Sequence, residues 1–169
     1  MTGVSVGEIQ KAENRMQQAL EENPLLCGIS NCVQSLLEAQ GSPPLIPIPG
    51  VIANELNAAH PTNRNYHLLT AIGVDTLMEI RIERQGFLAR KPGNPPMTME
   101  AVALVYLTSV PDGTLLFTAP VHYLGHQHRF TRWADENARS FRSDLKRVGH
   151  KVGRDIVDQL FTPTSAAAN

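Results

Sequence analysis

The stretch "DTLMEIRIERQGF", residues 75–87, decides the fold because apolar and charged side chains alternate along it. Its regular apolar positions are Met78, Ile80 and Ile82. Successive side chains of a β-strand point to opposite faces, so the alternation predicts a strand with one buried and one wet face. On the wet face, Glu79, Arg81 and Glu83 are typical of a solvated ladder of opposite charges rather than of paired catalytic carboxylates.

Two further strands follow this one. The segment "MEAVALVYLTSV", residues 99–110, is apolar at most positions, which is typical of a central strand covered on both faces. The tripeptide "PDG" at 111–113 favours a turn, and it joins this strand to "TLLFTAPVHYL", residues 114–124, as a hairpin. The three segments together predict an antiparallel meander.

A long helix is predicted after the sheet, from about Phe130 to Phe161, because apolar residues recur there at steps of three or four. Gly149 and Gly153 lie four positions apart on it and indicate close packing against a neighbouring backbone. The apolar stripe consists of Ala134, Ala138, Phe141, Leu145, Val148, Val152, Ile156 and Leu160. We expect four of its members to pack on four sheet residues: Phe141, Leu145, Val148 and Val152 on Met78, Ile80, Leu104 and Val105.

Two helices are predicted before the sheet-forming half. Ser5 and Glu8 match a capping box, in which each residue satisfies a free backbone donor of the other. The first helix ends at Asn23-Pro24, because proline cannot continue the hydrogen-bond ladder. The second is predicted over residues 29–41, with Gly41 as its stop.

The chain is predicted to form one α+β domain over residues 1–162. In this two-layer fold, an antiparallel three-stranded meander packs against the long C-terminal helix, with the N-terminal helices added. The segment "SPPLIPIPG", residues 42–50, holds four prolines and favours an extended connector over a central strand. Helical patterns follow at "VIANELNAA", residues 51–59, and at "YHLLTAIG", residues 66–73. Residues 163–169 are expected to be a disordered tail.

Charge and hydropathy argue against several classes of partner. The chain has 15 basic and 16 acidic residues, so no whole-molecule field attracts nucleic acid or anionic lipid. No apolar run approaches the roughly 20 residues that a membrane span needs. The first residues lack the basic and apolar regions of a signal peptide. Either the protein is cytoplasmic or its export signal has been removed.

Three of the six histidines lie in "VHYLGHQHRF", residues 121–130: His122, His126 and His128. On a strand, His126 and His128 share a face and can reach one ion, and Gly125 can fold the chain so that His122 joins them. A catalytic zinc takes three protein ligands, and no carboxylate or thiol with a known spacing stands nearby. The alternatives are therefore a metal site and a polar strand end that leads into the last helix.

Other signs of catalysis and of a bound cofactor are missing. The sequence contains no G-x-S-x-G elbow, no P-loop and no dinucleotide fingerprint. We therefore expect no catalytic residues and no cofactor. Cys27 and Cys32, the only cysteines, form a small-loop disulfide if the chain is exported and are buried thiols if it is cytosolic.

The last helix and its start offer two candidate surfaces. Arg142, Lys146 and Arg154 lie on a basic face that would serve a nucleic-acid-binding domain, but interleaved acids favour a merely solvated face. Phe130 and Trp133 stand at the helix start. Trp133 is interpreted as a core or edge anchor, and an exposed Trp beside Phe130 would instead indicate a protein interface.

Residues 66–161 resemble the soluble domains of small proteobacterial outer-membrane lipoproteins, of the curli-secretion CsgG and TolB N-terminal type. The features that carry this resemblance are "GVD" before the first strand, the "PDG" turn, "RWADENA" at the start of the last helix and "RDIVDQLF" at its end. The resemblance implies an α/β domain without catalysis, located in the periplasm at the outer membrane. It also implies association with other envelope proteins or with itself, and a lipid anchor that this chain does not contain.

The leading hypothesis is a non-enzymatic binding or assembly module of an envelope lipoprotein. The first alternative is a metal-binding protein or metal-dependent hydrolase that uses His122, His126 and His128. The second is a cytosolic nucleic-acid-binding domain that uses the basic face of the last helix.

Overall fold

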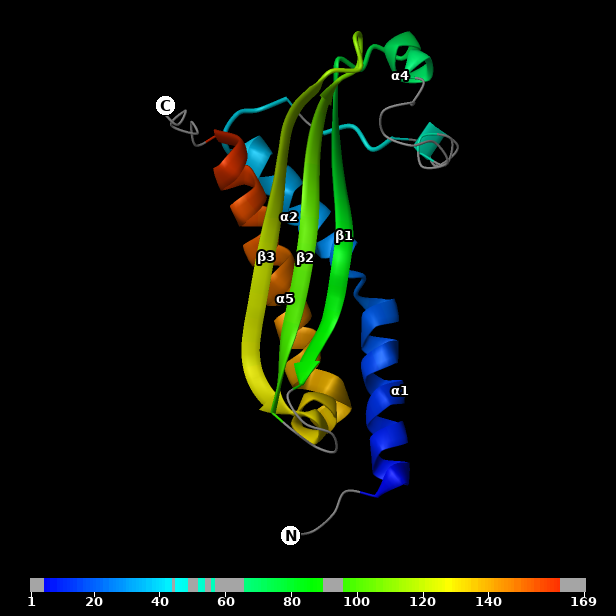
Figure 1. The fold of residues 1–169 in the computed structure, drawn as a ribbon, viewed down its shortest axis with the longest axis vertical. Coiled ribbons are helices and arrows are strands. Elements are labelled where there is room, and N and C mark those ends of the chain that lie inside the picture. Colours follow the sequence, from blue (N-terminus) through cyan, green and yellow to red (C-terminus); the bar gives the residue numbers. More distant parts are fainter. Residues whose placement is uncertain are drawn as a thin grey trace.

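A computed structural model describes residues 5–43, 45–48, 52–53, 56, 66–89 and 96–161. It forms two layers, with a three-stranded antiparallel sheet in the order β1-β2-β3, helices α2 and α5 against one face, and α1 packed against α5 (Figure 1). The predicted α+β fold with its antiparallel meander and long C-terminal helix is confirmed. The expected tail, 163–169, and most of the helical pattern over 51–59 lie outside the described residues.

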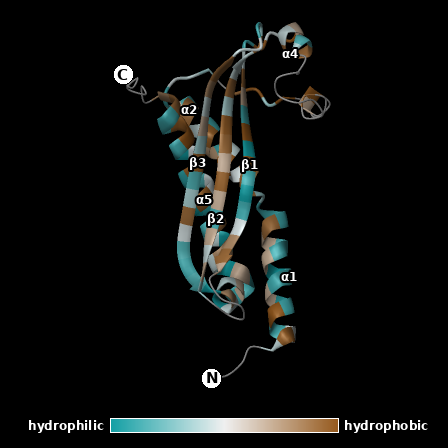
Figure 2. Ribbon diagram, in the orientation of Figure 1, coloured by the Kyte–Doolittle hydropathy of each residue, from teal (hydrophilic) through white to brown (hydrophobic). Residues whose placement is uncertain are grey.

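Helix α1, Val6–Glu22, begins at the predicted capping box. The Glu8 amide donates to Ser5 Oγ at 3.3 Å, and the Ser5 amide donates to the Glu8 carboxylate at 2.8 Å. The backbone hydrogen bond from Ser5 lowers the pKa of the Glu8 carboxyl. Ala12, Met16 and Ala19 are buried, and Figure 2 shows apolar and polar residues alternating around this helix. Periodicity and cap therefore act together to place α1.

Helix α2, Leu25–Ala39, starts four residues earlier than predicted, directly after Pro24. Pro24 stands at its N-cap, and a proline is tolerated at a helix start because the first amides have no helical acceptors. At the other end, Ser42 N–H donates to Leu37 O at 3.0 Å and Gly41 N–H to Glu38 O at 3.0 Å. Gly41 has a φ of +75°, so the helix ends in a Schellman motif that a glycine accommodates.

The strands are longer than the alternation alone predicted: β1 is Thr76–Ala89, β2 is Pro96–Ser109 and β3 is Leu115–Arg129. A short helix, α4, His67–Ala71, precedes β1. The "PDG" turn closes the β2–β3 hairpin, where Ser109 N–H donates to Thr114 O at 2.8 Å. Hydrogen bonds from Ser109 and Thr114 lower the pKa of the Asp112 carboxyl in this turn.

Strand β2 is central, as predicted, and its residues alternate between the two sheet faces. Val105 is fully buried opposite Ile80 of β1, whereas Leu104 lies opposite Arg81 and is only half-buried. The expectation that Leu104 packs under the last helix is therefore wrong, because adjacent strand residues point to opposite faces. The helix that packs on β1 also differs from the expectation. We expected α5 to pack on Met78 and Ile80 of β1, but α2 contacts β1, whereas α5 contacts β2 and β3.

Helix α5, Phe130–Phe161, is not continuous as predicted. Its backbone leaves the helical region at Asp135, with a ψ of 153°, and φ is positive at Glu136, Asn137 and Ala138. Left-handed backbone costs about 1–2 kcal/mol per non-glycine residue, so tertiary packing must stabilise this break. Trp133 before the break and Phe141 after it are both buried. The break lets the first turn and the main helix each bury an apolar residue.

The main part of α5 crosses α2 at the two glycines that the sequence singled out. A Cβ on Gly149 would stand 3.1 Å from the carbonyl carbon of Gly28, and one on Gly153 would stand 2.7 Å from Cys32 Cβ. The prediction that these glycines permit a close backbone approach is confirmed. The main hydrophobic core lies around this crossing and under the sheet.

Candidate functional site

The three histidines all lie on β3, because the strand continues to Arg129 instead of ending at Leu124 as predicted. The register shifts between Leu124, opposite Glu100, and Gln127, opposite Thr98. Gly125 and His126 therefore share the place opposite Met99, as in a β-bulge. The extra residue reverses the alternation, so His122 is on the opposite sheet face from His128.

His122 lies on the sheet face opposite to α2 and α5 and belongs to an ion-pair network. Its Nε2 is 2.9 Å from Glu100 Oε1, and Arg84 Nε and Nη2 stand 3.0 and 3.1 Å from the two carboxylate oxygens. Glu100 is only 5% exposed although it is a charged residue in a mostly apolar strand. A two-point arginine contact and a histidine compensate the removal of this carboxylate from water.

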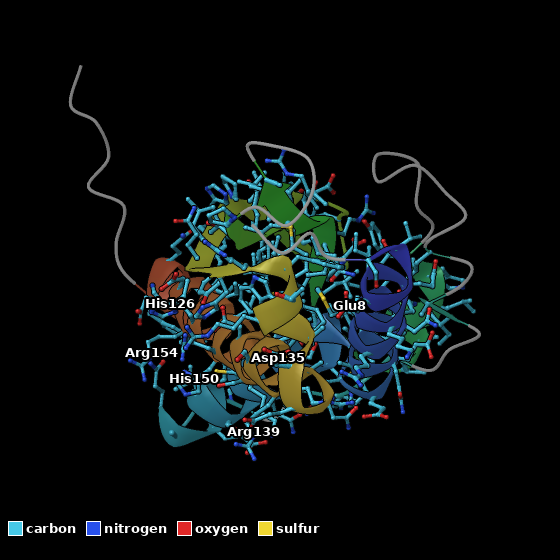
Figure 3. All side chains as sticks on the ribbon, turned by 90° about the horizontal axis from the view of Figure 1, so that it is seen from below. Glu8, His126, Asp135, Arg139, His150 and Arg154 are labelled. Atoms are coloured by element: carbon cyan, nitrogen blue, oxygen red, sulfur yellow. The ribbon has the colours of Figure 1, made fainter. Side chains whose placement is uncertain are left out.

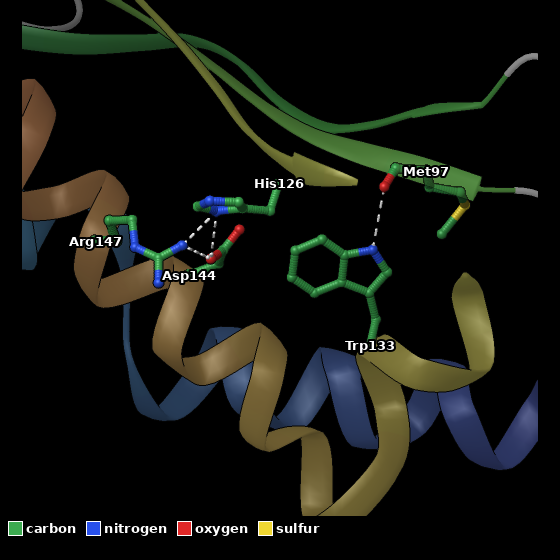
Figure 4. Close-up of polar contacts among 5 residues, drawn as sticks. All are labelled: Met97, His126, Trp133, Asp144 and Arg147. Atoms are coloured by element: carbon green, nitrogen blue, oxygen red, sulfur yellow. Dashed lines mark hydrogen bonds and ion pairs between the residues drawn. The ribbon is translucent and has the colours of Figure 1, made fainter. Parts of the chain in front are cut away.

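His126 lies at the edge between β3 and α5. Its Nδ1 is 3.9 Å from Asp144 Oδ1 and 2.5 Å from Arg147 Nη1, while Arg147 also binds Asp144 at 2.7 Å (Figure 4). Asp144 is 3% exposed, and a Cβ on Gly125 would stand 2.9 Å from its Oδ2. Burial raises the pKa of the neighbouring Tyr123 phenol, and the charge of Asp144 raises it further.

His128 faces the helix layer and stacks edge-on against Trp133, with ring centroids 4.8 Å apart. Trp133 is fully buried, and its indole N–H donates to Met97 O at 3.4 Å (Figure 4). The interpretation of Trp133 as a core anchor is confirmed, and the alternative of an exposed interface tryptophan is wrong. Phe130 is half-buried and packs against the same core.

The structure does not bring the three histidines together as one site. His122 contacts Glu100, which also binds Arg84. His126 contacts Asp144 and Arg147, and His128 packs against Trp133. Within the described ranges, no group of three or more His, Cys, Asp or Glu side chains is placed to hold a metal ion. The stretch "VHYLGHQHRF" is strand up to Arg129 and leads directly into α5 at Phe130, which agrees with the alternative of a polar strand end.

Cys27 is exposed and Cys32 is half-buried, so the alternative of two buried thiols does not hold for Cys27. Both residues are free thiols, so the alternative of a disulfide is not present either. The early start of α2 explains this. Five residues on one α-helix advance about 7.5 Å along its axis, which exceeds the Cα separation that a disulfide spans. Cys32 Sγ instead donates to His150 O at 3.4 Å, and burial raises the pKa of its thiol.

The basic face of α5 carries its own counter-charges. Arg142 pairs with Glu22 of α1, Lys151 pairs with Asp155, and Arg139 pairs with Glu136 at 2.7 Å. Arg139, His150 and Arg154 project outwards from the helix layer in Figure 3. Lys146 is exposed as well. The interleaved acids thus neutralise much of the face that a nucleic-acid-binding domain would use.

A cleft of about 570 Å³ follows the outer edge of β1, and no pattern in the sequence predicts it. Residues 77–83 of β1 line it without a break. The opposite wall consists of Leu26 of α2 with Ile48, Ala53 and Leu56. Leu26 is 43% exposed, so an apolar side chain stands uncovered at the cleft.

The backbone edge of β1 faces this cleft. In the part of the chain that the structure describes, β1 pairs with β2 alone. An edge strand presents main-chain donors and acceptors to any extended segment that reaches it. Met78, Ile80 and Ile82 point toward the helix layer, where they pack against the main core. On the other face, Arg81 Nε binds the Glu79 carboxylate at 2.5 Å and its guanidinium lies over the Tyr106 ring.

The other sheet edge, β3, differs in two respects. Pro120 stands in the middle of β3, and proline has no N–H for a further strand to bind. The bulge at Gly125 and His126 distorts the same strand further on. The regular part of β1, residues 76–82, contains no proline, and its register shift comes only between Ile82 and Arg84. Proline and bulges protect sheet edges from pairing, so β1 is the open edge of the pair.

Comparisons with protein-family models, curated proteins and solved structures found no match to this chain. Among the described helices, none has the length and apolar character needed to cross a bilayer.

The Arg84–Glu100–His122 network makes a testable prediction about the sheet face opposite to α2 and α5. Arg84→Met is expected to destabilise the protein by about 2 kcal/mol, because it leaves a buried carboxylate with His122 as its remaining partner. The double variant Arg84→Met with Glu100→Met is expected to be more stable than Arg84→Met, since no buried charge remains. Urea unfolding measures both, and a double variant less stable than the single one would contradict this account.

Proposed function

We propose that this chain is a non-enzymatic protein-binding module that takes up an extended polypeptide segment along the open edge of β1. The observation that carries the proposal is the cleft lined by the consecutive residues 77–83 of an edge strand. Seven residues of strand are about 23 Å long, which is the length of an ordinary β-strand. Strand addition to such an edge is a recurrent mode of peptide recognition.

The walls of the cleft define the segment that fits it. On the helix side they are apolar, with Leu26, Ile48 and Leu56 beside the inward side chains of β1. On the other side they carry Glu79, Arg81 and Glu83. A bound strand therefore presents apolar residues at alternate positions toward the helix layer and polar or charged residues between them. A sequence of this kind satisfies both walls at once.

The setting of this binding module is proposed from the resemblance of residues 66–161 to outer-membrane lipoprotein domains. That resemblance supports a role in the bacterial envelope, with an envelope protein or a second copy as partner. Strand addition suits such a role, because main-chain hydrogen bonds supply affinity and the alternating pockets supply selectivity.

Selection of displayed random heptapeptides on the immobilised protein tests the proposed function. We expect enrichment of peptides with alternating apolar and charged residues. Their affinity should fall at least about tenfold for Ile80→Lys, because a charge on the cleft side of the strand opposes burial of the peptide. The matched control is Leu124→Lys, which makes the same kind of change at an exposed position of β3. Its affinity should equal that of the wild type.

Two results would contradict the proposal. One is a selection without enrichment of alternating peptides. The other is an enriched peptide that slows amide exchange in β3 while leaving β1 unchanged. The exchange readout uses the wild-type protein, so it remains valid if Ile80→Lys does not fold.

A further inference from the structure

We infer that the segment taken up by the cleft is β1 of a second copy of this chain, so that two sheets join edge to edge. This inference rests on the proposed function of the β1 edge and names its partner. The inference comes from the order of side chains in "MEIRI", residues 78–82, and from the uncovered apolar wall beside it.

The strand is complementary to itself in one antiparallel register. Residues directly opposite one another in an antiparallel pair share a sheet face. When two copies of β1 pair about Ile80, Glu79 stands opposite the partner's Arg81, and Arg81 opposite the partner's Glu79. On the other face Ile80 meets the partner's Ile80, and Met78 meets the partner's Ile82. Within residues 78–82, charged residues thus face opposite charges and apolar residues face apolar ones.

The neighbouring registers lack this complementarity. Pairing about Arg81 places Arg81 opposite the partner's Arg81 and Glu79 opposite the partner's Glu83. Pairing about Glu79 places Glu79 opposite the partner's Glu79. Like charges directly opposite one another destabilise a strand pair, so the charges select the register about Ile80.

The apolar wall of the cleft supplies the area that such a contact buries. Leu26 is exposed at the cleft, and Met78, Ile80 and Ile82 are half-buried. A two-fold axis through the Ile80 pair places the helices of both copies on the same face of a six-stranded sheet. That arrangement covers the exposed apolar side chains and pairs the β1 edges of the two copies with each other.

Charge reversal with mixing tests the inference. Glu79→Arg places arginine at both positions of each copy, and Arg81→Glu places glutamate at both. Each variant alone then has two like-charge pairs, so its dimer should weaken at least about tenfold relative to the wild type. An equimolar mixture of the two variants restores both opposite-charge pairs between copies. It should sediment as a heterodimer at concentrations where each variant alone is a monomer.

Mixing the two variants distinguishes ion pairs between copies from the ion pair within one copy. The Glu79–Arg81 pair inside each strand stays broken in both variants, so the mixture restores only the pairs between copies. Arg129→Glu, at the end of β3, is the matched control and should dimerise like the wild type. Circular dichroism confirms that each variant is folded.

A wild-type protein that sediments as a monomer at all concentrations would overturn the inference, and so would a mixture in which both variants stay monomeric. Either result leaves the heptapeptide selection as a separate test of the β1 edge. A monomeric protein that still enriches alternating peptides has the proposed function with a different partner. Failure of both experiments would remove the proposed function as well.

Discussion

Gly153→Val is expected to destabilise the protein by about 3 kcal/mol or more, because α5 can no longer approach α2. Even a Cβ at this position would stand 2.7 Å from Cys32 Cβ, 3.0 Å from Cys32 Sγ and 3.1 Å from Ile29 O. These atoms belong to a helix backbone and to the base of a side chain, so neither can rotate away. The two helices must separate, and the buried contacts around Ile29 and Val33 must loosen.

Urea unfolding followed by the fluorescence of Trp133, the single tryptophan, measures this effect. Gly7→Val is the matched control, since nothing lies within 4 Å of a Cβ at that helical glycine. Its unfolding free energy should change by about 0.5 kcal/mol at most. In a Gly153→Ala background, Cys32→Gly should recover part of the lost stability by removing the nearest atoms. Equal stabilities for Gly153→Val and Gly7→Val would show that the helices do not cross at this point.

Trp133→Ala is expected to cost about 3–5 kcal/mol, because it removes a fully buried ring from an aromatic cluster. The Trp133 ring lies 5.3 Å from the Phe87 ring and 6.1 Å from the Phe141 ring, measured between centroids. Trp133→Phe should cost less, since it keeps much of the apolar area and loses only the indole donor to Met97 O.

Circular dichroism during urea unfolding measures the two tryptophan variants. If Trp133 served an interface between molecules, alanine would weaken association and leave the stability of the single chain nearly unchanged. A loss below about 1 kcal/mol for Trp133→Ala would therefore contradict the assignment of this residue to the core.

The sheet and the main helices could be predicted from sequence because their signals are local. The alternation around Ile80 and the capping box at Ser5 each depend on residues a few positions apart. The strands are longer than the segments in which apolar and polar residues strictly alternate, because pairing with β2 extends β1 to Ala89 and β3 to Arg129. The break at Glu136 was missed because the apolar stripe continues across it without interruption.

The contacts of the three histidines could not be predicted because their partners are distant in sequence. Glu100 on β2 and Asp144 on α5 contribute the carboxylates that contact His122 and His126. The bulge at Gly125 then places His122 on the other sheet face, and the spacing of the three histidines does not reveal it. A single glutamate within the apolar strand "MEAVALVYLTSV" was the one available signal of a buried ion pair.

The cleft along β1 could not be predicted from sequence. It depends on which helix packs against that strand, and the periodicity of a strand does not identify its neighbours. The long apolar stripe of α5 suggested that this helix packs under β1, whereas α5 lies under β2 and β3 and α2 approaches β1 instead. Residues 77–83 therefore keep an accessible edge beside Leu26. The charges of Glu79 and Arg81, first interpreted as a solvated ladder, acquire a second role as the selector of register in the proposed pairing.

Amide hydrogen exchange along the wild-type sheet, measured across a range of protein concentrations, tests most directly the claim that this chain assembles through β1. We predict that amides within residues 77–83 exchange more slowly as the concentration rises, while amides of β3 exchange at a constant rate. Exchange in β1 that is independent of concentration, or slowing confined to β3, would contradict the claim.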